Sequence, residues 1–259
     1  MRPDVLTLRD FYATPLGQAA ADLLARRIRE FWPDLTRQHL LGLGYAPPLL
    51  DRLPDAASRA ALMPAAQGVI HWPAMAGNAT ALVEDNAWPL PDGCFDRILL
   101  VHALETAEDL RGLLRESWRV LAPQGRLIAV VPRRRGAWSG SERTPFASGQ
   151  PFSRSQLTGL LSESMLAVRR VGGALYLPPW PGLARSRAMA LADRVGTHLI
   201  PGLSGLLIVE CEKRIFAPTP LRRVRRPAPA PAWGAAGRPV AAPFSRSPAS
   251  PRSRRESAG

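Results

Sequence analysis

A histidine and a carboxylate three residues apart, His102 and Glu105, directly follow the apolar run of residues 98–101. A short apolar run of this kind predicts a buried strand, so both side chains are expected where that strand ends. The unperturbed pKa of an imidazole suits a general base near neutral pH. His102 is therefore the candidate catalytic residue. The alternative is a strand-end histidine that bonds only to the backbone.

A second candidate region is the arginine-rich and aromatic segment 132–153. Loops of this length inside a compact domain are usually functional or disordered. Its aromatic side chains could form the apolar walls of a small-molecule pocket, and its arginines would favour an anionic ligand. A solvated arginine-rich surface is the alternative. The candidate ligand-contacting residues are Trp138, Arg143, Phe146 and Phe152.

Strands and helices alternate around these residues. Hydrophobic periodicity, helix caps and prolines predict strands at 39–43, 60–63, 80–84, 97–102, 126–131, 168–177 and 203–216, and helices at 14–32, 108–121, 153–162 and 181–195. Strands separated by helices imply crossover connections, hence an open α/β fold with a mostly parallel sheet and helices on both faces. The short connection between the last two strands allows one antiparallel edge strand.

Ligands of such sheets bind beyond the carboxyl ends of the strands. We therefore expect chemistry in the loops after the first, third and fourth strands. The predicted organisation is an N-terminal helical cap at 1–35, the α/β domain at 36–216 and a disordered tail rich in Pro and Arg at 217–259.

Two consecutive blocks of sequence resemble a known family. Residues 88–105 read WPLPDGCFDRILLVHALE and residues 110–132 read LRGLLRESWRVLAPQGRLIAVVP. Both are similar to class I S-adenosylmethionine-dependent methyltransferases of the type 11 kind. The resemblance implies a Rossmann-like fold with a seven-stranded sheet whose final strand is antiparallel. It also implies S-adenosylmethionine as cofactor and a small-molecule acceptor. We expect a cytoplasmic, bacterial enzyme.

The resemblance also implies where the cofactor would lie. In the family, an acid at the end of the third strand accepts a hydrogen bond from the adenine amino group, and Glu84 or Asp85 stands near that position. A solvated pair of loop acids is the alternative. The cofactor-binding residues implied by the resemblance are Gly42, Gly44, Tyr45, Met63, Glu84, Asp85, Asn86, Trp88 and His102.

The sequence departs from the family at the first two strands. Gly42 stands where the family has an acid, Pro48 replaces the third glycine of the loop, and the acid that ends the second strand is missing at Met63. Gln67 could replace the lost ribose contacts, and Trp72 could stack on a purine or simply close the core. Two functions therefore stay open. One is an active methyltransferase, and the other is a catalytically inactive binding or regulatory protein that has lost the cofactor site.

Composition limits the partners. The chain has 259 residues and a formal net charge of +13, and nine of its arginines lie in 217–259 with one acid. Such a tail supports nonspecific electrostatic contacts, so no specific nucleic acid is expected. We expect no metal, because the histidines lack ligand spacing. No membrane span or signal peptide is expected, because no apolar run approaches the roughly 20 residues a span needs. The oligomeric state stays open.

Overall fold

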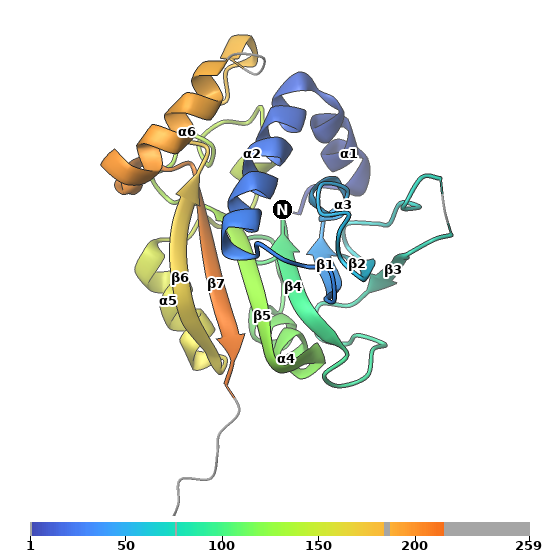
Figure 1. The fold of residues 1–259 in the computed structure, drawn as a ribbon. Helices are drawn as coiled ribbons and strands as arrows, with labels where there is room; N and C mark the ends of the chain where they lie inside the picture. Colours follow the sequence, from blue (N-terminus) through green and yellow to red (C-terminus); the bar gives the residue numbers. More distant parts are fainter. Residues whose placement is uncertain (1, 76, 184–186, 215–259) are drawn as a thin grey trace, which may run out of the picture. The chain divides into compact units, whose positions relative to one another are not determined.

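The centre of the molecule is a seven-stranded sheet with the strand order β3-β2-β1-β4-β5-β7-β6 (Figure 1). The structure is a computed structural model that describes residues 2–75, 77–183 and 187–214. The sheet's strands are β1 (His39–Gly44), β2 (Ser58–Pro64), β3 (Thr80–Val83), β4 (Phe95–Val101), β5 (Leu121–Pro132), β6 (Leu166–Ala174) and β7 (Leu206–Lys213). Strand β7 runs antiparallel to both of its neighbours, and the pairs among β1 to β5 are parallel.

Several helices begin at residues that can accept the free N–H groups of a first turn. Asp4, Thr14 and Asp109 each cap a helix in this way, and Ser153 forms a capping box with Gln156. The helices are α1 (Val5–Ala13), α2 (Pro15–Phe31), α3 (Pro47–Leu50), α4 (Leu110–Val120), α5 (Arg154–Glu163) and α6 (Arg187–Leu199).

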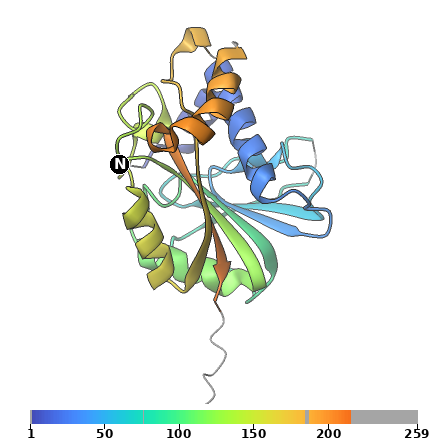
Figure 2. The same ribbon diagram turned by 60° about the vertical axis from the view of Figure 1, so that its left-hand side comes forward.

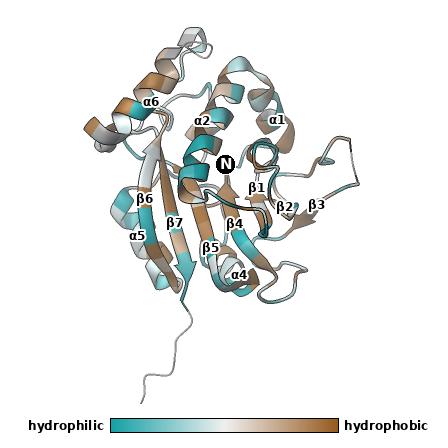
Figure 3. Ribbon diagram, in the orientation of Figure 1, coloured by the Kyte–Doolittle hydropathy of each residue, from teal (hydrophilic) through white to brown (hydrophobic). Residues whose placement is uncertain are grey.

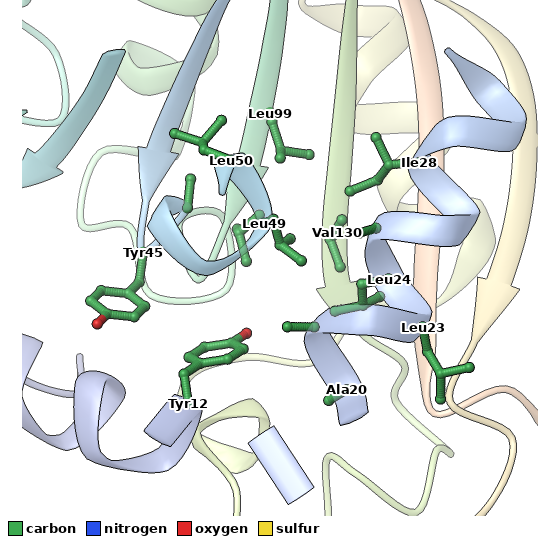
Figure 4. Packing of buried hydrophobic residues seen from close by; sticks show 14 of the residues in the cluster. Tyr12, Ala20, Leu23, Leu24, Ile28, Tyr45, Leu49, Leu50, Leu99 and Val130 are labelled. Atoms are coloured by element: carbon green, nitrogen blue, oxygen red, sulfur yellow. The ribbon is translucent and has the colours of Figure 1, made fainter. Parts of the chain in front are cut away.

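Helices cover both faces of the sheet (Figure 2). Each face has its own hydrophobic cluster. Alternate residues of β4 pack in the two clusters. Leu99 packs in the cluster that contains Ile28 of α2 and Leu49 of α3 (Figure 4). Leu100 packs in the cluster with Leu113 of α4. This alternation is the period of a strand buried on both sides, and it holds the end of β4 firmly in place.

The predicted fold class is confirmed, with one error in the placement of the antiparallel strand. The sequence allowed that strand at the edge of the sheet. Instead β7 lies between β5 and β6, and β6 is the edge strand. Residues 206–211 of β7 are all buried, as an interior strand requires.

Other elements differ in extent. The helix predicted at 181–195 begins at Arg187 and reaches Leu199, because Pro181 starts a short 3-10 turn. Helices α1 and α3 were not predicted. Among the described residues, no helix combines the length and apolar content needed to cross a bilayer. The predicted disordered tail lies outside the described residues.

Candidate active site

The parallel strands β1 to β5 end on one edge of the sheet, and the candidate residues follow them. Tyr45 comes after β1, Glu84 after β3, His102 after β4 and Arg133 after β5. This is the edge at which open α/β sheets bind ligands.

The loop after β1 turns tightly against β4. Gly44 has a φ of +84°, and a Cβ there would overlap the carbonyl oxygen of Val101. The Tyr45 N–H donates to that same oxygen at 2.9 Å. Pro47 and Pro48 then open α3, where the first N–H groups need no partner within the helix. The structure therefore accommodates Pro48 by replacing a glycine loop with the start of a helix.

The two missing carboxylates have physical explanations. A Cβ on Gly42 would overlap the Cβ of Ala46 and touch Leu50, so no acidic side chain fits at that position. Met63, at the end of β2, is fully buried in the hydrophobic cluster beneath α2. Both positions therefore belong to the packed core of the domain.

His102 and Glu105 lie together, buried, at the end of β4. The His102 Nδ1 atom is 3.5 Å from Glu105 Oε1, and Nε2 is 3.0 Å from the Tyr12 hydroxyl. His102 has a φ of 54°, an uncommon conformation for a residue with a side chain and one that occurs often at functional sites. Within the part of the chain that the structure describes, neither carboxylate oxygen of Glu105 has a hydrogen-bond partner.

Aromatic rings surround this pair. Tyr12 of α1 stacks on Tyr45 with ring centroids 5.7 Å apart (Figure 4). Phe146 lies over the His102 ring at a centroid distance of 4.4 Å. Burial raises the pKa of Tyr45 to about 12. Burial, and then the nearby charge of Glu105, raise the pKa of Tyr12 well above its usual value. Both phenols are therefore neutral, and they can donate or accept hydrogen bonds near His102.

The acids after β3 have different surroundings. Asp85 is buried and forms a two-pronged pair with Arg2, with both distances 3.0 Å, and it also accepts from the Glu108 N–H. Glu84 is exposed and lines a small cavity of about 130 Å³ that Arg2 also lines. The Asn86 amide donates to Asp109 at 3.1 Å. Of the two acids after β3, Glu84 is thus the one whose carboxylate a ligand can reach.

Gln67 lies in the turn after β2 and is buried. Its side-chain amide has no hydrogen-bond partner among the described residues. Its backbone oxygen accepts from the Val5 N–H of α1 at 2.8 Å. Trp72 closes the core, with its indole N–H bonded to Asp51 at 2.8 Å, so the core interpretation of that residue is the one that fits. Trp88 packs in the cluster on the α4 side.

The aromatic residues of segment 132–153 divide between the two faces. Trp138 and Phe146 are buried in the same cluster as Tyr12, with ring centroids 5.8 Å apart. Phe152 packs against the opposite cluster. Arg143 is exposed and lines an opening of about 440 Å³ whose other walls are mainly apolar. That opening also includes Asp10, Phe11, Thr14, Pro15, Leu16 and Pro181.

Sequence reasoning missed the first residues of the chain. From Arg2 to Tyr12 they run along the strand edge, contacting Asp85 after β3, Gln67 after β2 and His102 after β4. A signal for α1 was present in Asp4 as a cap with Thr7 three residues on. Nothing in the local pattern could reveal the long-range partners of Arg2.

Known proteins match this chain in sequence and in fold. Residues 40–129 match the family model described as a methyltransferase domain. Demethylmenaquinone methyltransferase from Thermus thermophilus is 31% identical over 116 residues, which are 44% of this chain and 51% of that protein. The chain thus spans about half the length of this curated relative.

Two solved structures have a similar fold. Geranyl diphosphate C-methyltransferase from Streptomyces coelicolor has a TM-score of 0.50 at 15% identity, with 74% of this chain and 78% of that chain covered. The YcgJ protein from Bacillus subtilis has a TM-score of 0.50 at 16% identity, with 74% and 98% covered. Residues 40–129 of this chain therefore match a methyltransferase domain in sequence, and the strand order together with the two solved structures shows that the fold is that of class I methyltransferases.

Proposed function

We propose that this chain transfers the methyl group of S-adenosylmethionine to a small-molecule acceptor. The observation that carries the proposal is the set of buried side-chain atoms without a hydrogen-bond partner among the described residues on Glu105, beside His102, and on Gln67, in the turn after β2. Buried polar atoms normally have hydrogen-bond partners. A ligand with an ammonium group and hydroxyls supplies what these residues lack.

The residues at the edge fit this cofactor. Glu105 would hold the ammonium group, Gln67 the ribose hydroxyls and Glu84 the adenine amino group. The cofactor supplies an electrophilic methyl group on a sulfonium, and the protein's task is to orient an acceptor in line with it. Arg2 and Tyr12, which now contact residues of this edge, would have to withdraw.

His102 is the proposed general base. Its Nε2 atom, which now lies 3.0 Å from the Tyr12 hydroxyl, would take the proton of an acceptor O–H or N–H in that place. Glu105, 3.5 Å from Nδ1, would orient the ring. The acceptor would enter by the opening beside Phe11, whose ring contacts Phe146 at a centroid distance of 6.4 Å. The walls there favour an acceptor with an apolar body.

The experiment is calorimetric titration of S-adenosylmethionine and S-adenosylhomocysteine into the full chain. We expect micromolar binding, weakened roughly tenfold or more by Glu105→Gln and by Gln67→Leu, since each removes a ligand hydrogen bond. Glu163→Gln, on the exposed side of α5, is the matched control and should bind like the parent. Absence of heat, together with no thermal stabilisation at millimolar ligand, would refute the proposal.

A second candidate function has its own observations. The carboxylate positions of the family are taken by Gly42 and Met63, and Arg2 and Tyr12 contact Asp85 and His102. These features favour a catalytically inactive protein that binds another partner through a methyltransferase fold. Titration of the Tyr12→Ala variant separates the two functions. If neither the parent chain nor this variant binds S-adenosylmethionine, the result favours the inactive protein.

A further inference from the structure

Exposed apolar side chains gather on and around α6. Eleven large hydrophobic side chains are exposed in the described part of the chain, and six of them lie between residues 180 and 203. Figure 3 shows hydrophobic residues along this helix. Soluble proteins rarely leave such a set of side chains together without a partner. The set, called here the α6 surface, is Trp180, Leu191, Val195, Leu199, Ile200 and Leu203.

The orientation of α6 is fixed by its other side. Asp193 is buried, with its carboxylate 3.3 Å from the Arg27 guanidinium of α2 and bonded to the Leu175 N–H at 2.8 Å. Leu191, Val195 and Leu199 recur every four residues and share the opposite side. They are 62%, 43% and 74% exposed. The helix cannot turn these side chains inward without breaking the contacts of Asp193.

The charges beside this apolar stripe are positive. On α6, Asp193 is buried, and Arg194 is the other formally charged residue whose side chain the structure describes. Arg194 is exposed next to Val195, and Arg26 is exposed on the neighbouring α2. Glu30, an acid that lines the same cavity as Leu191, Val195 and Leu199, is paired with Arg27 at 2.6 Å.

We propose that the α6 surface docks on an anionic membrane. An apolar helix face flanked by arginine is typical of helices that lie in the membrane interface. Basic residues near such a surface are drawn to anionic lipids. A second copy of the chain is a poorer partner, because a symmetric contact would bring the same positive charges together. The inference does not depend on methyl transfer.

Co-sedimentation of the full chain with lipid vesicles tests the proposal. We expect binding to phosphatidylcholine vesicles that contain about 30% phosphatidylglycerol, and little binding to phosphatidylcholine alone. The double variant Leu191→Ser/Leu199→Ser should bind at least about tenfold more weakly, because it removes most of the apolar contact. Val69→Ser/Leu82→Ser, exposed hydrophobic positions elsewhere, is the matched control and should bind like the parent. Brominated lipid should quench the fluorescence of Trp180, and Trp180→Phe should remove that part of the signal.

Three results would overturn the proposal. The parent could stay in the supernatant with anionic vesicles. The double variant could bind as tightly as the parent, which would assign the binding to another basic segment. Sedimentation equilibrium could find a dimer that the double variant abolishes while vesicle binding is absent, which would assign the α6 surface to a second copy. Thermal unfolding of each variant checks that the exposed substitutions leave the fold intact.

Discussion

Single residues explain why this domain lacks the carboxylates that methyltransferases of the matching family have at these positions. A Cβ on Gly42 would overlap the Cβ of Ala46. Met63 packs in the hydrophobic core at the end of β2. An acid at either place would be buried without a partner, which costs more free energy than a ligand contact returns. Glu105 and Gln67 instead hold buried side-chain atoms that have no hydrogen-bond partner among the described residues.

Substitution of Gly42 tests this packing. We expect Gly42→Ala to lower the free energy of unfolding by about 1–3 kcal/mol, because the new methyl group overpacks the contact between β1 and α3. Gly159 in α5 has open space where a Cβ would stand, with nothing within 4 Å, so Gly159→Ala should raise stability by about 0.5–1 kcal/mol. Urea denaturation measures both. A Gly42→Ala variant as stable as the parent would contradict the close approach.

Arg2 offers a second test at this scale. Its pair with Asp85 is nearly buried, with 6% and 9% of the two side chains exposed. Arg2→Ala should cost about 1–3 kcal/mol of unfolding free energy, because Asp85 stays buried with one partner fewer. Arg9→Ala removes an exposed pair with Asp10 and should change stability by less than about 0.5 kcal/mol. Equal effects of the two variants would mean that Arg2 is not held at Asp85.

At the scale of elements, α1 is the part of the site that the sequence did not reveal. Its buried and exposed leucines allow a matched test of its docking. Leu8 is fully buried, and Leu8→Ala should destabilise the domain by about 2–5 kcal/mol. Leu6 is about half exposed, and Leu6→Ala should have little effect. Equal unfolding free energies for the two variants would refute the packing of α1 on the sheet edge.

The sequence predicts elements well where the pattern is local. The buried strands and the Thr14 and Ser153 caps were predictable, because alternation and capping involve neighbouring residues. The contacts of Arg2 with Asp85, and of Tyr12 with His102, join residues more than 80 positions apart. No local pattern encodes such pairs, so the sequence could predict an N-terminal helical cap but not which residues of the strand edge it contacts.

The whole molecule carries a pH dependence set by buried weak acids. Burial raises the pKa of Tyr45 from 10.0 to about 12 and that of Cys211 from 9.0 to about 12. The folded chain therefore keeps protons that the unfolded chain releases from about pH 9 upward. Stability from these groups is complete below pH 9 and is lost as the pH rises towards 12, with a slope of up to about 1.4 kcal/mol per pH unit for each group.

Urea denaturation between pH 8 and pH 12 checks this expectation. Tyr45→Phe should flatten the loss of stability between about pH 10 and pH 12, because the variant has no phenol to ionise there. It retains the ring that stacks on Tyr12. A variant with the same alkaline slope as the parent would show that Tyr45 ionises freely in the folded chain.

Docking through the α6 surface would also orient the molecule. Pro181 follows Trp180 in the chain and lines the opening beside Phe11. A molecule seated on lipid through α6 would therefore hold that opening close to the bilayer. Acceptors with apolar bodies would then reach the candidate site from the membrane.

The position of α1 would limit how fast a ligand can bind at the strand edge. Tyr12 of α1 contacts His102, and Arg2 lines the cavity beside Glu84, so a ligand that uses these residues as proposed would have to wait for this N-terminal segment to lift. The observed rate of association should then level off as ligand concentration rises, at a ceiling equal to the opening rate of the helix. The apparent affinity should fall in proportion to the fraction of molecules that are open. The opening rate of the first turns of the chain would thus limit the rate of every binding event at this edge.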